Sequence, residues 1–175
     1  GGVISSGADD VQKSGGAILL EGTSSVLISS DSLFYGNRAV KKGGAIYAYI
    51  DSRSVISNCK FISNYISGGV SGGAIDFEQA YSNLTNNEFV FNKVQGSHGG
   101  SAIAAWSYQN PSEIQILKSN FTYNTFEPSL AIKHGAAIAL YYCKTFYGCK
   151  VVIKDSHFVG NVVSSETTGA AMYVW

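Results

Sequence analysis

Short runs of alternating apolar and polar residues follow one another along the whole chain, and clusters of Gly, Asn and Ser separate them. Residues 45–50 (Ala-Ile-Tyr-Ala-Tyr-Ile) and 54–57 (Ser-Val-Ile-Ser) are two such runs. Alternation with a period of two is typical of a β-strand with one buried face, while Gly, Asn and Ser favour turns. The helical pattern, in which apolar residues lie three and four apart, is missing. We therefore expect an all-β chain in which strand, turn, strand and turn follow in each unit.

The units repeat with a regular spacing. An Ala-Ile pair, or Ala-Met in the last copy, begins at residues 17, 45, 74, 102, 137 and 171, so that successive steps are 28, 29, 28, 35 and 34 residues. One Phe-x-x-Asn tetrapeptide lies in each interval: Phe34–Asn37, Phe61–Asn64, Phe89–Asn92, Phe121–Asn124 and Phe158–Asn161. Leucine-rich, ankyrin and tetratricopeptide repeats need a helical pattern that is missing here. A period of about 28 residues instead predicts a right-handed parallel β-helix, a solenoid of about six coils whose equivalent strands are parallel neighbours.

Alternation also predicts which side chains face the core. In the first strand of each coil, one inward ladder is made by Ile18, Ile46, Ile75, Ile103, Ile138 and Met172. In the second strand, the inward position is held by Ile56, Leu84, Ile116 and Ile153, and Ile28 is one position out of step. The repeated Phe residues should form an aromatic ladder. The repeated Asn residues should hydrogen-bond the turns and one another, and they tolerate a left-handed backbone.

Charge is scarce along the chain, which narrows the partners that we expect. Twelve Lys and Arg balance twelve Asp and Glu, and charged residues make up only 14% of the sequence. A chain of this kind lacks the basic surface that holds nucleic acid or an anionic membrane. No apolar run reaches the roughly 20 residues of a membrane-spanning helix. We therefore expect no nucleic acid partner and no membrane insertion in this segment.

Both ends resemble copies of the repeat that are cut short. Gly1-Gly2-Val3-Ile4 is similar to the repeat motif, and residues 169–175 stop just inside another copy. A solenoid needs atypical repeats as caps over its terminal edges. We therefore expect residues 1–175 to be one β-helix segment without terminal caps, as part of a longer chain or a filament.

The paired Gly-Gly-Ala-Ile and Phe-x-x-Asn motifs resemble those of the polymorphic membrane proteins, the chlamydial family of autotransporter adhesins, and those of related surface proteins of protists. The resemblance covers nearly the whole chain, although the later copies depart from it, as in Gly100-Ser101-Ala102-Ile103. It implies a right-handed β-helix on the cell surface, with adhesion or self-assembly as its role. It implies no catalytic residues.

Acidic residues provide little support for an enzyme. Many right-handed β-helices are polysaccharide lyases or hydrolases, which need paired carboxylates or an acidic calcium cluster. Asp9-Asp10 is the only adjacent acidic pair, and Asp31 and Asp155 occupy turn positions. The three His residues are scattered, without Cys or carboxylates at ligand spacing. We predict that the protein is not an enzyme and has no catalytic residues, no metal site and no cofactor.

Cysteines and sequons indicate an extracellular or cell-surface location. Cys59 takes an inward position and should be a buried free thiol, whereas Cys143 and Cys149 bracket the longest insertion and should form a disulfide. Asn83-Leu84-Thr85 and Asn120-Phe121-Thr122 are N-glycosylation sequons. Because both asparagines fall on outward positions, Asn83 and Asn120 are the predicted glycosylation sites.

Large aromatic side chains follow the outward positions of the first strand. They are Tyr47, Tyr49, Trp106, Tyr141, Tyr173 and Trp175. Single exposed aromatic side chains are common on β-sheet surfaces, but a row of this length goes beyond such scattered exposure. It predicts a binding surface for sugar rings, for the protein's own glycans or for a neighbouring copy.

Three functional hypotheses follow. The leading one is a structural component of an extracellular or cell-surface fibre or appendage, which assembles with copies of itself through stacked coils. The first alternative is a surface adhesin shaft that binds host or matrix glycans through the aromatic surface. The second alternative is a polysaccharide lyase or hydrolase, which requires a convergent acidic cleft. The expected partners are other copies of the chain and glycans.

Overall fold

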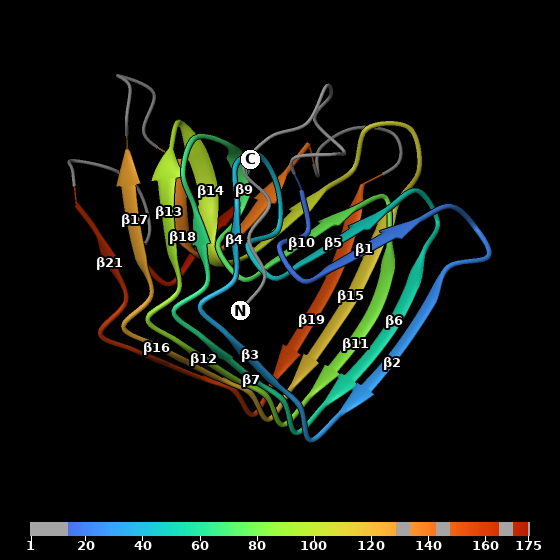
Figure 1. The fold of residues 1–175 in the computed structure, drawn as a ribbon, viewed down its shortest axis with the longest axis horizontal. Coiled ribbons are helices and arrows are strands. Elements are labelled where there is room, and N and C mark those ends of the chain that lie inside the picture. The colour runs from blue at the N-terminus through green and yellow to red at the C-terminus, as the bar shows by residue number, and fades with distance from the viewer. Residues whose placement is uncertain (1–13, 129–133, 143–147, 165–169, 175) are drawn as a thin grey trace.

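A computed structural model describes residues 14–128, 134–142, 148–164 and 170–174. These residues form a right-handed parallel β-helix built from four sheets (Figure 1). The chain passes through the first, second, third and fourth sheets in turn and then returns to the first sheet one coil further along. Equivalent strands of successive coils pair in parallel. The predicted all-β class and parallel β-helix are confirmed.

Each sheet collects one strand from every coil. The first sheet contains β1 (Ile18–Glu21), β5 (Ile46–Tyr49), β10 (Ile75–Glu78), β14 (His98–Trp106), β18 (His134–Tyr141) and β22 (Met172–Val174), with β9 (Val70–Gly72) paired to β14. The second contains β2 (Val26–Ser30), β6 (Arg53–Ser57), β11 (Tyr81–Thr85), β15 (Ser112–Leu117) and β19 (Cys149–Lys154). The third contains β3 (Leu33–Tyr35), β7 (Lys60–Ile62), β12 (Glu88–Val90), β16 (Asn120–Thr122) and β20 (His157–Val159). The fourth contains β4 (Arg38–Ala39), β8 (Tyr65–Ile66), β13 (Lys93–Gly96), β17 (Thr125–Pro128) and β21 (Val162–Val163).

The coils contain more strands than the sequence predicts, because left-handed residues break the second predicted strand. The corner between the second and third sheets is made by Asp31, Asn58, Asn86, Lys118 and Asp155, with φ from 51° to 56°. The corner between the third and fourth sheets is made by Gly36, Ser63, Phe91, Tyr123 and Gly160. The second to fourth sheets have five strands each, so the described chain has fewer complete coils than the six predicted.

Aliphatic and aromatic ladders fill the interior. Ile46, Ile75, Ile103 and Ile138 pair in register and are fully buried. The five repeated Phe rings stack along the axis, with centroids 4.6, 4.9, 4.7 and 4.8 Å apart. Both ladders were predicted and are confirmed. Parallel pairing in register is what brings identical side chains together in this way.

The repeated Asn residues form a third ladder, which holds successive coils together. In each step one Asn donates through Nδ2 to Oδ1 of the next Asn, at 2.9 to 3.0 Å. The same Oδ1 also accepts a hydrogen bond from the backbone amide of the preceding Asn in the ladder. The amide of Asn64, for example, donates to Oδ1 of Asn92 at 3.0 Å. Nδ2 of Asn92 further donates to the carbonyl of Phe61 at 2.8 Å. The predicted ladder is confirmed, but the left-handed residue is the one before each Asn and not the Asn itself.

Ile28 departs from the prediction. It pairs with Val55 and not with Ile56, and its side chain is 78% exposed. The inward neighbour of Ile56 is Ser29, whose Oγ lies 3.6 Å from Sγ of Cys59. The first described coil therefore keeps the common register, and the interpretation of Ile28 as a displaced core residue is wrong. Cys59 is buried and free, as predicted.

Candidate functional site

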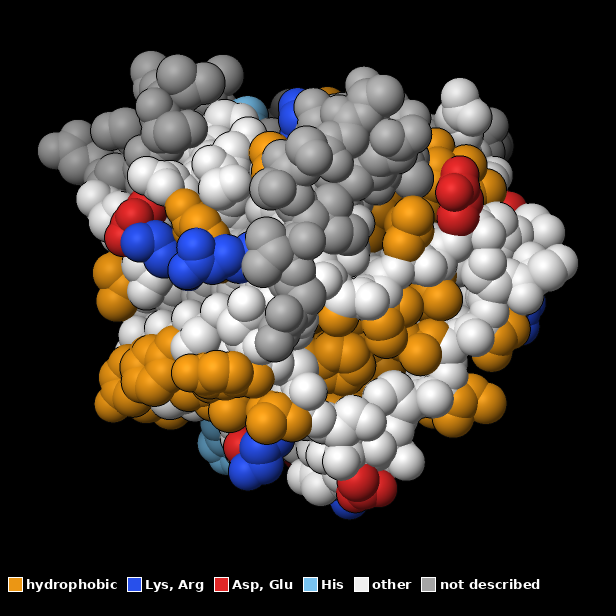
Figure 2. Space-filling model, in the orientation of Figure 1, with side chains coloured by type: hydrophobic (Ala, Val, Ile, Leu, Met, Phe, Trp, Pro, Cys, Tyr) orange, Lys and Arg blue, Asp and Glu red, His pale blue; other side chains and the backbone are white. Residues whose placement is uncertain are grey.

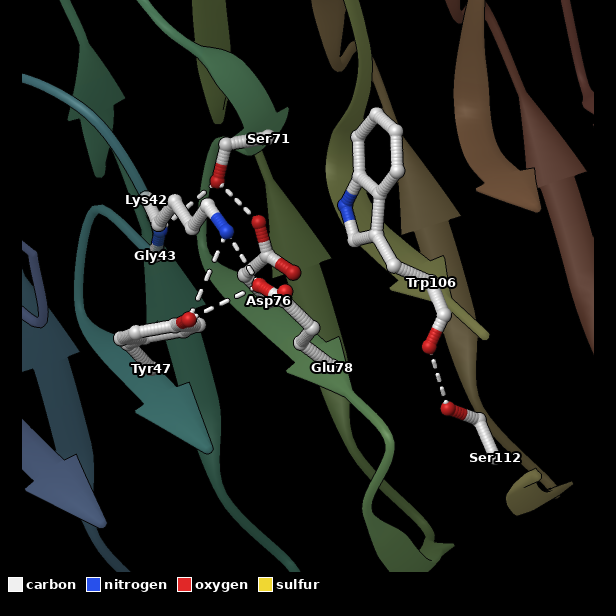
Figure 3. Close-up of polar contacts among 8 residues, drawn as sticks. All are labelled: Lys42, Gly43, Tyr47, Ser71, Asp76, Glu78, Trp106 and Ser112. Carbon is white, nitrogen blue, oxygen red and sulfur yellow. Dashed lines mark hydrogen bonds and ion pairs between the residues drawn. The ribbon is translucent and has the colours of Figure 1, made fainter. Parts of the chain in front are cut away.

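The outer face of the first sheet carries the side chains that depart most from the repeat. Asp76 and Glu78 lie two residues apart on β10, so both point away from the core. In the pairing register Asp76 lies between Tyr47 and Ala104, and Glu78 lies between Tyr49 and Trp106. Figure 3 shows the two carboxylates beside Lys42, Tyr47 and Ser71. We call these five side chains, from Lys42, Tyr47, Ser71, Asp76 and Glu78, the polar cluster.

Hydrogen bonds and an ion pair connect the members of the polar cluster. Lys42 Nζ contacts Glu78 Oε2, and Tyr47 Oη donates to the same oxygen at 2.8 Å. Ser71 Oγ donates to Asp76 Oδ2 and accepts the backbone amide of Gly43 at 2.8 Å (Figure 3). Lys42 and Tyr47 belong to one coil, in the stretch between β4 and β6. Ser71, Asp76 and Glu78 belong to the next coil, between β8 and β11. The cluster therefore joins two adjacent coils on the outside of the sheet.

Burial controls the electrostatics of the polar cluster. Burial raises the pKa of Asp76 to about 7, Lys42 opposes this rise, and Glu78 adds to it. For Lys42, burial acts to lower the pKa, but the nearby carboxylates of Asp76 and Glu78 outweigh it and the pKa is raised. Burial, and then Glu78, raise the pKa of Tyr47 well above its usual range. Lys42 is thus a cation and Tyr47 a neutral donor at neutral pH, where Asp76 is close to its titration midpoint.

Two buried polar atoms at this site have no hydrogen-bond partner among the residues that the structure describes. They are Oδ1 of Asp76 and Nε1 of Trp106, on residues that are 0% and 4% exposed. Figure 3 shows Trp106 on the strand next to β10, with its backbone oxygen accepting a hydrogen bond from Ser112 at 2.7 Å. An unpaired buried polar atom costs about 1–3 kcal/mol. These two unpaired atoms therefore lower the stability of the folded protein, and the ion pair and hydrogen bonds of the polar cluster offset part of that loss.

Three of the six residues of the predicted aromatic binding surface are buried. Its side chains do lie on the outer face of the first sheet, but Tyr47, Trp106 and Tyr141 are only 1%, 4% and 1% exposed. The expectation that these three form an exposed surface is wrong. The rings pack on one another instead, with Trp106 and Tyr141 stacked 4.1 Å apart and Tyr47 5.6 Å from Tyr49.

The rest of this aromatic row is less enclosed. Tyr49 and Tyr173 are half-buried, and Tyr173 lies 5.8 Å from Tyr141. Trp175 lies outside the described residues. Two aromatic residues that the sequence did not single out complete the packing, since Tyr108 and Tyr142 lie 4.6 Å apart beside Trp106.

The sequence reasoning also missed the carboxylate pair Asp76 and Glu78. Their spacing was the available signal, because two acids that alternate on a strand share one face. The equivalent positions in the neighbouring coils hold uncharged residues, Tyr47 with Tyr49 and Ala104 with Trp106. A paired acid is the chemistry that a glycosidase needs. Here both carboxylates are buried, at 0% and 6% exposed, and one of them is paired with Lys42.

Both predicted glycosylation sites lie on the outer surface. Asn83 and Asn120 are exposed, on β11 and β16. Asn83 lines a groove of about 330 Å³ across the second sheet, together with Tyr81 and Gln115. The outward placement of both asparagines is confirmed, and their occupancy stays a prediction.

The cysteines of the insertion are partly described. Cys149, at the start of β19, is disulfide-bonded, whereas Cys143 lies outside the described residues. The predicted pairing with Cys143 therefore stays a prediction. Within the described ranges, no three His, Cys, Asp or Glu side chains come together in a way that could hold a metal ion. Nor do these ranges contain a helix long and apolar enough to cross a membrane.

Comparison with known proteins agrees with the fold. A family model described as a right-handed beta helix region matches residues 7–175. Searches among curated proteins and among solved structures gave no match.

Proposed function

Because the chain belongs to the right-handed β-helix family, we propose that it is a structural shaft of a cell-surface or extracellular appendage. The observation that carries this proposal is the Asn ladder, in which the side chains of Asn64, Asn92 and Asn124 hydrogen-bond to the coils on either side. Such a ladder extends to any number of coils without a new kind of contact. The recurring residues therefore make a rod rather than a cleft.

Assembly through the ends of the rod is the second part of the proposal. In the described chain β22 pairs with β18 on one side only. Two side chains of β22 at core positions, Met172 and Val174, are 48% and 51% exposed. A strand with unpaired backbone groups and exposed apolar side chains is a template for another strand. A further coil, from the same chain or from a copy, would cover them.

An extracellular location has three sources of support. Asn83 and Asn120 are exposed sequons, Cys149 is disulfide-bonded, and disulfides persist in oxidising compartments. The resemblance to chlamydial autotransporter adhesins and protist surface proteins favours the same location. Mass spectrometry of glycopeptides from protein made in a secretory host tests the sequons. Two unmodified asparagines would remove that support.

Catalysis is less favoured than a scaffold. Asp76 and Glu78, the one carboxylate pair on a strand face in the described part of the chain, are buried, and Lys42 neutralises part of their charge. A glycan-binding shaft that uses the aromatic row is less favoured too, because Tyr47, Trp106 and Tyr141 are covered. We therefore propose a protein that is not an enzyme, whose main partners are further β-helix coils.

Negative-stain electron microscopy and sedimentation velocity of the purified chain over a range of concentrations test the assembly. We expect rods that lengthen with concentration. The double variant M172K/V174K should stop the growth, because two buried ammonium groups oppose stacking. The matched control is Val159→Lys, on an outward position that is 53% exposed, and it should assemble like the unmodified protein. A monomer at every concentration would contradict the proposal.

A further inference from the structure

The corner between the third and fourth sheets favours residues without a bulky side chain. Its position in each coil has a left-handed backbone, with φ of 63° at Gly36, 55° at Ser63, 54° at Phe91, 53° at Tyr123 and 62° at Gly160. Glycine adopts this conformation without a steric penalty, whereas a bulky residue there is an outlier. Phe91 and Tyr123 therefore reduce stability relative to the residues used in the other coils.

Burial does not explain the two aromatic side chains. Phe91 is 56% exposed and Tyr123 is 51% exposed, so most of the apolar surface of each ring faces solvent. A third aromatic residue with positive φ, Tyr142, differs in this respect, because it packs beside Trp106 and Tyr108. A strained residue that the fold does not need is a reason to look for a function.

The two rings form an open ledge. They stack with their centroids 5.5 Å apart and their planes 11° from parallel. Tyr123 lies directly over Gly160, where a Cβ would come within 2.3 Å of the ring. On the other side of the pair, the equivalent corner residue of the preceding coil is the small, exposed Ser63. The second face of the Phe91 ring therefore meets no other ring among the described residues.

The surroundings of the ledge combine apolar side chains with a cation. Figure 2 shows hydrophobic side chains gathered along the edge where the third sheet turns into the fourth, at the lower left of the view. The exposed Tyr35 and Val159 lie at the ends of the third-sheet strands that lead into this corner. On the adjoining fourth-sheet strand, the exposed Arg38 lies over the ring of Tyr65 at 5.5 Å. Arg38 has no carboxylate within ion-pair distance among the described residues.

We propose that this corner binds an acidic polysaccharide, with one pyranose ring against the open face of Phe91 above Ser63. The C–H face of a sugar is apolar and its hydroxyl groups stay solvated, which suits a ring that is half exposed. Arg38 lies at the strand that follows Gly36, next to Tyr65 in the Ser63 coil, and can pair with the carboxylate of a uronic acid. This binding site is separate from end-to-end assembly and does not depend on it.

Isothermal titration calorimetry with polygalacturonate, with neutral dextran as the comparison, tests the site. We expect the unmodified protein to bind polygalacturonate. Phe91→Gly should weaken this binding at least tenfold while the Tm stays the same or rises, because glycine is favoured at a φ of 54°. Arg38→Gln should also weaken it. The control Ile28→Ser, at a residue that is 78% exposed on the second sheet, should bind normally.

Each of four results in the binding and stability measurements would overturn the proposal. They are no binding by the unmodified protein, unchanged binding by Phe91→Gly, equal binding of dextran with no effect of Arg38→Gln, and a lower Tm in Phe91→Gly. Loss of rod growth in Phe91→Gly, with no sugar bound by either form, would make the corner a contact between copies and would also overturn it. Failure of the unmodified protein to form rods bears only on the assembly proposal.

Discussion

In the interior Phe and Asn ladders the same residue type returns at the same position, whereas on the outer face of the first sheet neighbouring coils differ. Asn64, Asn92 and Asn124 are equivalent interior residues. The outer positions of the first sheet hold Tyr47 in one coil, Asp76 in the next and Ala104 in the third. Parallel coils in register place equivalent side chains in contact, so a repeated residue must pair with itself. Amides and aromatic rings can do this, but identical charges repel.

Charge can therefore enter such a structure only where the next coil does not repeat it. The partner is either an opposite charge at the same position, as for Lys60 and Glu88, or a residue from a different position. The polar cluster follows this rule, because Lys42 comes from the segment before β5 and Glu78 from the end of β10. The interior ladder tells us how the fold is held. The outer face of the first sheet is where individual coils differ, so substitutions in the interior ladders and on the outer face should have different effects on stability.

The largest effect is expected for Asn92→Ala. Asn92 is fully buried, and its loss would remove the Oδ1 that accepts both the backbone amide and one Nδ2 proton of Asn64. It would also remove the Nδ2 that donates to the carbonyl of Phe61 and to Oδ1 of Asn124. Each buried group left unpaired costs about 1–3 kcal/mol, so unfolding should become easier by about 4 kcal/mol or more. Urea unfolding followed by circular dichroism measures this. Asn83→Ala, on the exposed face of β11, is the control and should change stability by less than about 0.5 kcal/mol.

The next effect is a dependence on pH. The pKa of Asp76 is about 7 in the folded protein and near 3.9 when unfolded. Between these values the unfolded chain has released a proton that the folded protein keeps, so stability should fall as pH rises from about 4 to about 7. The loss should reach roughly 4 kcal/mol.

Asp76→Asn shows whether Asp76 causes this loss. The difference in free energy of unfolding between the variant and the unmodified protein should grow in favour of the variant across that pH range. A difference that does not change with pH would show that Asp76 ionises as readily in the folded state as in the unfolded chain.

A third prediction compares two ion pairs. Glu78→Gln should lower stability by about 2–3 kcal/mol, because it leaves the mostly buried ammonium of Lys42 without its carboxylate. Glu88→Gln removes the carboxylate that lies 3.1 Å from Lys60, and the side chains of Lys60 and Glu88 are 56% and 44% exposed. That change should cost less than about 1 kcal/mol. Thermal unfolding of the two variants gives the comparison, and equal losses would count against a special role for the polar cluster.

The smallest effect is expected on the outside of the first described coil. Ile28→Thr should change stability by less than about 0.5 kcal/mol, since Ile28 is 78% exposed on β2. Ile56→Thr, in the adjacent coil, buries a hydroxyl group and removes a methyl group in the core, and should cost about 2 kcal/mol. Chemical unfolding of both variants checks the register, and a large loss for Ile28→Thr would support a displaced core residue after all.

The sequence predicts the recurring interior residues better than the outer residues that occur in one coil only. The ladders of Phe89 and Asn92 were predictable because their residues recur, and recurrence fixes both the register and the face. Ile28 was misread because an apolar residue next to the expected position looks like a slipped strand, although the pairing of its neighbours holds the register. The extra corners escaped because residues as different as Asp31 and Lys118 can adopt a left-handed backbone.

The candidate sites were less predictable, because they arise once and depend on what covers them. Alternation placed Trp106 and Tyr141 on the outer face correctly, but it carries no information on whether that face meets solvent. Asp76 and Glu78 share a face by their spacing, whereas Lys42 reaches them from a turn whose path no alternation describes. Exposure and the meeting of distant segments are tertiary properties.

Residue-resolved hydrogen exchange by NMR tests most directly whether the Asn ladder holds the fold. The backbone amides of Asn64, Asn92 and Asn124 each donate to Oδ1 of the next ladder residue at 3.0 Å. We expect these amides to be among the slowest to exchange, with protection that equals the free energy of global unfolding. Exchange as fast as in the exposed turn at residues 22–25 would contradict a fold held by its interior ladder.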